Sequence, residues 1–244
     1  MNYLPLGLLL YLALQLFGCT PQPTPAVKQE QRTTAGGRQY TLWHPGPLAM
    51  QVVTRRPAID QPECQLSVAA AYTDLQTTQP LDLLVYQGHL RQAQATVGWL
   101  DGVLTLIDTT LTITRIAPGQ TPPSAVLAQV RRQKGTLLLQ ELLVYQGQNQ
   151  KVAGGSRFQR RALVELASHR FALIESVSDS LTLQQFGQDL VELGAHNALY
   201  LDMGDWDAGW YRQANKVVQL GYRRSQTARQ SNWLVFVERL PAQP

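Results

Sequence analysis

Short strand-like segments separated by turn residues dominate the first half of the chain and limit which folds it can adopt. Several of them are rich in β-branched residues, which favour the extended backbone of a pleated sheet. Asp101-Gly102 has the composition of a tight hairpin turn, and Gln87-Gly88 is a further turn signal. The segments expected to form strands are residues 40–43, 50–54, 66–72, 81–86, 89–95, 98–100, 103–107 and 110–116.

Two segments carry helix signals. Ser124 is a candidate N-cap for a short helix over residues 124–134, which a glycine then stops. Thr182 and Gln185 form a capping box, and the apolar residues that follow lie on one side of a second helix. Gly194 ends this helix where a left-handed residue is needed.

The second half of the chain otherwise returns to strands. Residues 162–167 and 171–177 alternate strongly around a polar turn, which predicts a hairpin. Residues 137–145 predict one strand, residues 198–201 a short apolar one, and residues 233–240 the last. Antiparallel strands with an inserted crossover helix predict an α+β domain: a mixed, mostly antiparallel β-sheet core with a few helices packed on it.

The N-terminus has the pattern of an export signal. Residues 4–17 are almost purely apolar, yet too few to span a membrane comfortably as a mature helix. They lead into Gly18-Cys19, which resembles the lipobox of bacterial lipoproteins. We therefore expect a signal peptide over residues 1–18, lipidation of Cys19 and anchoring to a membrane of the bacterial cell envelope. An ordinary secretory signal or an uncleaved N-terminal anchor is the alternative.

The next segment is expected to be a tether. Residues 19–38 contain three spaced prolines, polar residues and a Gly-Gly pair, so they cannot build a core. The folded domain is then expected over residues 39–244. If Cys19 is lipidated, Cys64 has no partner for a disulfide. Because Cys64 lies beside an apolar run, we expect a buried, unreactive thiol.

Composition and missing motifs exclude several classes of function. Hydrophobic residues make up 44% of the chain and charged residues 16%, as in a globular core. The net charge of +4 is mild and the arginines are scattered, so no nucleic-acid partner is expected. The sequence contains no Walker loop, no dinucleotide fingerprint and no Gly-x-Ser-x-Gly, which argues against nucleotide-dependent enzymes and serine hydrolases.

An acidic loop after a short apolar strand is the strongest candidate for a functional site. Residues 198–201 lead into Asp202, and Asp205 and Asp207 follow within five positions. Three close carboxylates repel one another unless a cation, a proton or basic side chains compensate them. The alternative is an acidic surface loop whose tryptophans pack in the core.

The order of motifs around this loop resembles the phosphodiester glycosidase family. The resemblance begins at Arg160-Arg161-Ala162-Leu163, before the hairpin, and extends to Asp202-Met203-Gly204 after the apolar strand. Two departures stand out: a Gly-Gly-Gly-Ser segment of the family is Met-Gly-Asp-Trp here, and its Asn-Gly-Gly segment is replaced by residues 69–74. Within the stretch of resemblance, the segments that correspond to family motifs are Leu181-Thr182-Leu183, Leu193-Gly194, Ala198-Leu199 and Leu201-Asp202.

The resemblance implies a set of site residues. Arg161, with Arg160 beside it, is expected to clamp a phosphate, because a guanidinium pairs bidentately with phosphate oxygens. Asp202 is the leading catalytic carboxylate, with Asp205 and Asp207 as partners in acid–base chemistry or as ligands of a divalent cation. The remaining candidates for substrate binding are Tyr72, Asp74, Gly204, Trp206, Trp210 and Arg212.

These observations predict a cell-envelope hydrolase that acts on a glycosyl phosphodiester or a related surface-glycan bond. Its ligand would be a carbohydrate or glycosyl phosphate, and its N-terminal lipid would hold it at a membrane. The sequence establishes no cofactor, although a divalent cation would suit the three carboxylates. Two alternatives stay open: a non-catalytic module of the same fold that binds a glycan or partner, and a structural envelope lipoprotein without a small ligand.

Overall fold

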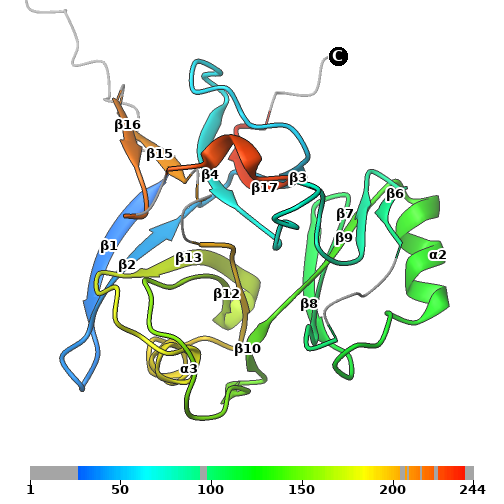
Figure 1. The fold of residues 1–244 in the computed structure, drawn as a ribbon. Coiled ribbons are helices and arrows are strands. Elements are labelled where there is room, and N and C mark those ends of the chain that lie inside the picture. Colours follow the sequence, from blue (N-terminus) through cyan, green and yellow to red (C-terminus); the bar gives the residue numbers. More distant parts are fainter. Residues whose placement is uncertain are drawn as a thin grey trace, which may run out of the picture.

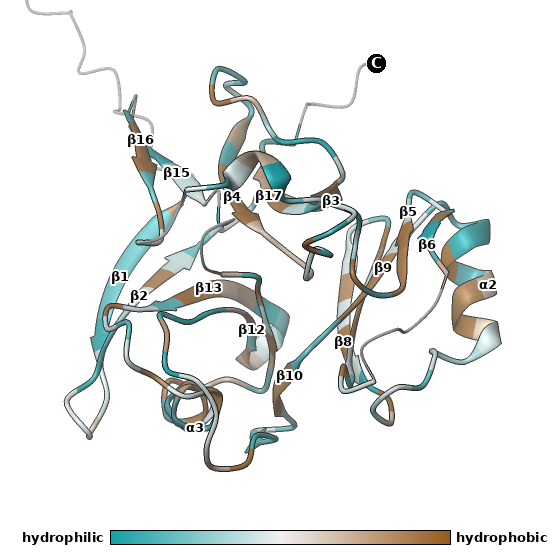
Figure 2. Ribbon diagram, in the orientation of Figure 1, coloured by the Kyte–Doolittle hydropathy of each residue, from teal (hydrophilic) through white to brown (hydrophobic). Residues whose placement is uncertain are grey.

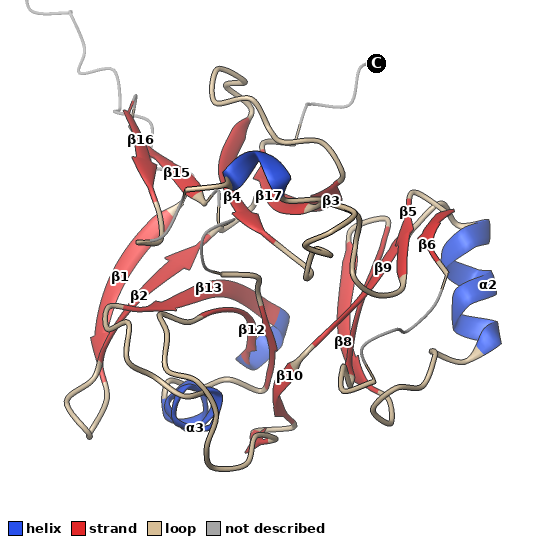
Figure 3. Cartoon of the chain, in the orientation of Figure 1, coloured by secondary structure: helices blue, strands red, loops and turns tan. Residues whose placement is uncertain are grey.

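The first of three β-sheets holds the strand that leads into the acidic loop. The computed structural model describes residues 27–93, 98–203, 207, 209–214, 216–222 and 225–239. This first sheet has seven strands, with β14 between β12 and β10. Its order is β1 (Lys28–Thr33), β2 (Gln39–His44), β13 (Arg170–Ser176), β12 (Arg161–Leu166), β14 (Asn197–Tyr200), β10 (Leu142–Tyr145) and β11 (Gln148–Asn149). Figure 3 labels its strands β1, β2, β13, β12 and β10.

The other two sheets have five strands each. The second contains β16 (Lys216–Gln219), β15 (Trp210–Gln213), β4 (Cys64–Ala69), β17 (Trp233–Val237) and β3 (Ala49–Val53), in that order. The third contains β6 (His89–Gln92), β5 (Leu84–Tyr86), β9 (Thr136–Gln140), β7 (Gly102–Ile107) and β8 (Thr110–Arg115). Figure 1 shows the third sheet as a separate green layer beside the other two.

Every strand pair in the described part of the chain is antiparallel, so the expected mixed sheet is wrong. The predicted crossover helix does exist and connects β13 to β14. These two strands run in the same direction because both are antiparallel to β12, which lies between them. The crossover therefore skips one strand and creates no parallel pair.

In the part of the chain that the structure describes, two α-helices cover the sheets, as expected for a few helices packed on a β core. α3 (Leu183–Glu192) begins with the predicted Thr182–Gln185 capping box and buries Phe186 and Leu190. It packs on β10 and β11, whereas α2 (Ser124–Arg132) packs on β9 and β7. Pro123, not Ser124, is the N-cap of α2, and no side chain caps it. The 3-10 turns are Ala167–His169 and Thr227–Arg229.

The predicted strand over residues 137–145 is two strands in different sheets. β9 ends at Gln140 and β10 begins at Leu142, so the chain passes from the third sheet to the first at Glu141. The side chains on both sides of this point are buried, and Figure 2 colours both strands as strongly hydrophobic. A continuous apolar run cannot reveal such a change of sheet, because each half satisfies the same burial pattern.

Turn geometry confirms one sequence signal and corrects another. Gln87-Gly88 joins β5 to β6 with positive φ at both residues, as a two-residue hairpin of twisted strands requires. Asp101-Gly102 makes no hairpin: Gly102 starts β7, and a Cβ there would lie 2.2 Å from Leu199 Cδ2. Close approach between two sheets, not a turn, therefore requires this glycine.

The predicted tether extends too far. β1 lies within residues 19–38, yet it forms the edge of the seven-stranded sheet and pairs with β2 along its whole length. Arg38 also forms a bidentate ion pair with buried Asp189 of α3, at 2.5 and 2.6 Å. The folded domain thus begins by Lys28, because polar strand residues at an edge can use backbone pairing in place of burial.

Neither of the two α-helices in the described part of the chain is long and apolar enough to cross a membrane. The apolar N-terminal segment and Cys19 lie outside the described residues. Cys64 is buried at the start of β4, and burial raises the pKa of its thiol to about 11. This environment agrees with the expectation of an unreactive thiol.

Candidate functional site

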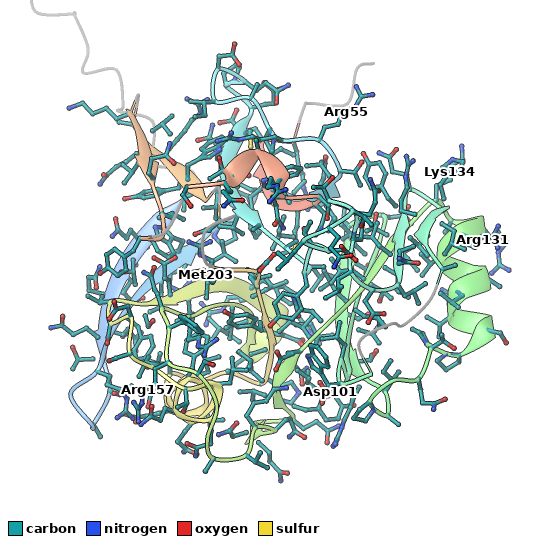
Figure 4. The ribbon with its side chains drawn as sticks, viewed as in Figure 1. Arg55, Asp101, Arg131, Lys134, Arg157 and Met203 are labelled. Atoms are coloured by element: carbon teal, nitrogen blue, oxygen red, sulfur yellow. The ribbon has the colours of Figure 1, made fainter. Side chains whose placement is uncertain are left out.

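A pocket of about 500 Å³ is lined mainly by segments that connect the strands, together with Tyr200 at the end of β14. Asp202 and Met203 line it just after β14, and Tyr72 and Thr73 contribute from the segment that follows β4. Met203 is labelled near the middle of the molecule in Figure 4, whereas Arg55, Arg131 and Lys134 lie at its periphery. A volume of this size suits a sugar residue with its substituent.

Asp202 is partly buried and its backbone and side chain are both held in place. Its amide donates to Ala70 O at 2.9 Å, which fixes the loop against the end of β4. Hydrogen bonding from the backbone amides of Met203 and Thr73 and from the Gln230 side chain favours the ionised form of its carboxylate. Burial raises the pKa of Asp202 to about 7, with repulsion from Asp207 adding to the effect, although the three hydrogen bonds oppose it. A carboxyl group with this pKa can exchange a proton near neutral pH.

Side-chain amides from the segment before β17 hold Ala71, which precedes the pocket residues Tyr72 and Thr73. Asn232 accepts from the Ala71 amide at 2.7 Å and donates to the Ala71 carbonyl at 3.1 Å. Gln230 donates to the same carbonyl at 3.2 Å. These residues shape the segment that replaces the Asn-Gly-Gly motif, and the sequence analysis missed them because nothing in their local pattern indicates a partner about 160 residues away.

Arg161 does not clamp a ligand, contrary to the sequence-based expectation. Its side chain is fully buried, and Nη1 and Nη2 pair with the Asp207 carboxylate at 2.7 and 2.9 Å. Nε donates to Glu175 at 2.7 Å. The guanidinium is therefore used within the protein, and its observed role is to hold Asp207 beside the pocket.

The same ion pairs compensate part of the negative charge of the acidic loop. Arg161 supplies the counter-charge for Asp207, and burial raises the pKa of Glu175 on its other side. Gly221 allows the close packing here: its φ is +76°, and a Cβ would lie 2.1 Å from Asp207 Oδ2. Asp179 and Asp207 also line the pocket, but Asp179 is exposed and the Asp207 carboxylate is already bound by Arg161. Asp202 is therefore the partly buried carboxyl group best suited to chemistry.

Arg160 lies behind the pocket wall. Its guanidinium donates to the carbonyls of Leu181 and Ser156 at 3.0 and 2.5 Å and to the Tyr200 hydroxyl at 3.2 Å. It also packs over the rings of Phe158 and Tyr200, 5.3 and 5.5 Å from their centroids. Arg160 is buried, so it can reach a ligand only through Tyr200 or Phe158.

Three other predicted substrate-binding residues do not line the pocket. Asp74 is partly buried, and its carboxylate accepts hydrogen bonds from the amides of Gln76 and Thr77 in its own turn. Trp210 is buried in the core, in agreement with the alternative that the tryptophan is structural. Arg212 stacks on Trp210 and donates to backbone carbonyls of residues 59–64, away from the pocket.

The remaining predictions at the acidic loop are not tested by the structure. Gly204, Asp205 and Trp206 lie outside the described residues. Among the residues that are described, no three His, Cys, Asp or Glu side chains cluster to hold a metal ion. The expectation of a divalent cation therefore depends on Asp205 and stays a prediction.

Exposed aromatic side chains surround the pocket, and sequence analysis did not select them. Trp99, Phe158 and Tyr222 are 53%, 42% and 63% exposed, and all three line the pocket. They come from three distant parts of the chain, so no sequence spacing could group them. Flat aromatic faces at the mouth of a polar pocket are suited to packing against the apolar face of a sugar ring.

The chain has no match among family models, and no curated protein matches its sequence. Its fold is similar to that of the catalytic domain of zebrafish N-acetylglucosamine-1-phosphodiester alpha-N-acetylglucosaminidase, auto-inhibited by its pro-peptide. The TM-score is 0.61 at 12% sequence identity, over 89% of this chain and 85% of that chain. A hypothetical protein from Synechocystis gives a TM-score of 0.59 at 16% identity, over 88% of this chain and 63% of that chain. At such identities the likeness is one of fold alone.

Proposed function

We propose that the chain is a hydrolase of a glycosyl phosphodiester, or of a related surface-glycan bond, in the bacterial cell envelope. The observation that carries the proposal is the position of Asp202, a partly buried carboxyl group in the pocket with a pKa of about 7. The fold shared with the zebrafish enzyme domain supports the reaction class. The exposed side chains of Trp99, Phe158 and Tyr222, which form an aromatic rim around the pocket, support a sugar ligand.

In the proposed reaction, Asp202 acts as a general base. Its carboxylate accepts a proton from a water molecule, the water oxygen bonds to the anomeric carbon, and the bond from that carbon to the phosphate oxygen breaks. The phosphate monoester leaves with the electron pair. Because the second pKa of a phosphate monoester is near 6, this leaving group needs no acid to assist it. The reaction is therefore expected to speed up as pH rises through about 7, when Asp202 ionises.

A non-catalytic glycan-binding module is the second candidate. It is favoured by a specific observation. Arg161, the arginine that the family resemblance assigned to a phosphate, forms its ion pairs with Asp207 and Glu175 instead. In that case the aromatic rim around Trp99 would hold a sugar, and Asp202 would contribute a hydrogen bond without turnover.

The envelope location rests on the sequence pattern that ends at Cys19. Metabolic labelling with a fatty acid would test it, because replacing Cys19 by Ser should abolish labelling. Loss of the label together with release from the membrane fraction would support the proposed anchor. Labelling that persists in the variant would rule out Cys19 as the lipidated residue.

The activity is tested by incubating the purified chain with an N-acetylglucosamine-1-phosphodiester. Asp202→Asn should abolish turnover while leaving the protein folded, since asparagine has nearly the same shape. Asp108→Asn is the matched control, because Asp108 is an exposed turn residue with positive φ, where asparagine is also tolerated. Turnover retained by Asp202→Asn would refute the catalytic assignment. Sugar binding without turnover in the wild type would favour the binding module.

A further inference from the structure

The Arg160 guanidinium is buried without a carboxylate partner. Only 6% of the residue is exposed, and among the ion pairs of the described residues Arg160 takes part in none. Its partners are two carbonyl oxygens, a hydroxyl and two aromatic faces, all of which are neutral. Burying a cation that forms no ion pair is costly, so this charge is available to stabilise an anion in the pocket.

Tyr200 lies between Arg160 and the pocket. Its hydroxyl oxygen accepts a hydrogen bond from Arg160 Nη1 at 3.2 Å, which makes the O–H group a stronger donor. Burial raises the pKa of Tyr200 to about 12, although Arg160 opposes the shift, so the hydroxyl keeps its proton at neutral pH. Tyr200 is 96% buried, yet it lines the pocket and, in the described part of the chain, its hydroxyl hydrogen has no acceptor.

The two other tyrosines of the pocket have already used their hydroxyl hydrogens. Tyr72 donates to Glu141 at 2.8 Å, and the other oxygen of that carboxylate is paired with Lys151 at 2.9 Å. Tyr222 donates to the Val177 carbonyl at 2.7 Å. Of the three described tyrosines that line the pocket, Tyr200 alone can therefore donate to a ligand.

We propose that Tyr200 donates a hydrogen bond to an anionic oxygen of a phosphodiester bound beside Asp202, and that Arg160 is the positioning residue that polarises and orients Tyr200. This inference rests on the proposed function and deepens it by naming the group that recognises the phosphate. The cation of the site acts through a neutral hydroxyl, and it is Arg160, not the neighbouring Arg161, that supplies the charge.

The position of Tyr200 in the chain is consistent with this role. Residues i and i+2 of an extended segment face the same side, so Tyr200 and Asp202 both face the pocket while Leu201 turns into the core. The phosphoryl oxygen at Tyr200 would thus lie next to the glycosidic bond on which Asp202 acts. A short strand end delivers both groups with a fixed separation.

Binding to a hydrolysis-deficient protein tests the inference. In the Asp202→Asn background, the affinities of methyl N-acetylglucosamine-1-phosphodiester and of the neutral methyl N-acetylglucosaminide are measured by calorimetry. Tyr200→Phe should weaken the charged ligand about 10-fold or more, in the range for a hydrogen bond to a charged group, and leave the neutral ligand nearly unchanged. Tyr86→Phe, at a partly buried tyrosine outside this pocket, is the matched control.

A second pair of variants separates positioning from mere folding. Arg160→Gln should also weaken the phosphodiester selectively, and Arg160→Lys should recover part of the loss. In the Tyr200→Phe protein, Arg160→Gln should add little, because the arginine acts through the hydroxyl that is already absent. Equal weakening of both ligands, or full additivity of the two substitutions, would overturn the inference.

Turnover distinguishes this inference from the proposed function. If Tyr200→Phe in an otherwise wild-type chain hydrolyses the phosphodiester with unchanged KM and kcat, the Tyr200 role is refuted while the hydrolase assignment stands. If the wild type neither binds nor hydrolyses the phosphodiester, both fail. Selective loss of phosphodiester affinity in Tyr200→Phe, with Asp202→Asn inactive, supports both.

Discussion

The pKa of Asp202 makes a quantitative prediction about stability as well as activity. Burial raises it from 3.8 to about 7 in the folded protein. The folded state therefore binds more protons than the unfolded state between these values, and stability must fall as pH rises through this window. A shift of roughly 3 units corresponds to at most about 4 kcal/mol of unfolding free energy between pH 4 and pH 8.

Asp202→Asn isolates this effect because asparagine does not titrate. Glu175, whose pKa burial also raises, titrates in both proteins, so its contribution cancels in the difference. Between pH 4 and pH 8, the unfolding free energy of the wild type should fall by up to about 4 kcal/mol relative to that of Asp202→Asn. For a domain of this size that is about 10 °C in relative Tm.

The assay is thermal or urea unfolding of both proteins at pH 4, 5, 6, 7 and 8. Placing an amide opposite the Thr73 and Gln230 groups changes the unfolding free energy by the same amount at each pH. The informative quantity is therefore how the stability difference between the two proteins changes with pH. The groups that face Asp202 are Asp207, Tyr72, Tyr200, Thr73 and Gln230. A stability difference that is flat across the series would refute the raised pKa, and with it the reason to assign Asp202 the proton transfer.

Three further outcomes follow from the site. Arg161→Ala should destabilise the fold by about 3–5 kcal/mol in urea unfolding, because Asp207 and a second carboxylate lose a buried partner; a stable variant with only a raised KM would restore the ligand-clamp hypothesis. Gly221→Ala should lower Tm by several degrees, since its Cβ would collide with Asp207 at φ +76°, and an unchanged Tm would contradict that packing. Trp99→Ala should weaken glycan binding about 10-fold in calorimetry with little change in Tm, because the side chain is 53% exposed; unchanged affinity would remove Trp99 from the sugar site.

Local signals in the sequence were sufficient where partners lie close in the chain. The predicted features include the capping box of Thr182 and Gln185, the β12–β13 hairpin and the strand that leads into Asp202. Each of them depends on residues that lie close together in the sequence. Asp202, which follows this buried strand, lines the pocket, and its catalytic role stays a prediction. Such features need only backbone preferences and the periodicity of burial.

Only the tertiary structure decided what the charged residues do. Arg161 and Asp207 are 46 positions apart in the chain, and their pairing converts an expected ligand clamp into a buried support. The neighbouring Arg160 faces the aromatic wall behind Tyr200 instead, because successive residues of an extended segment point to opposite sides. The sequence by itself thus determined many of the strands, the two helices and the place of a carboxylate at a strand end, which follow from short-range physics. Which charge is neutralised and which stays available depended on side chains that meet only when the three sheets pack together.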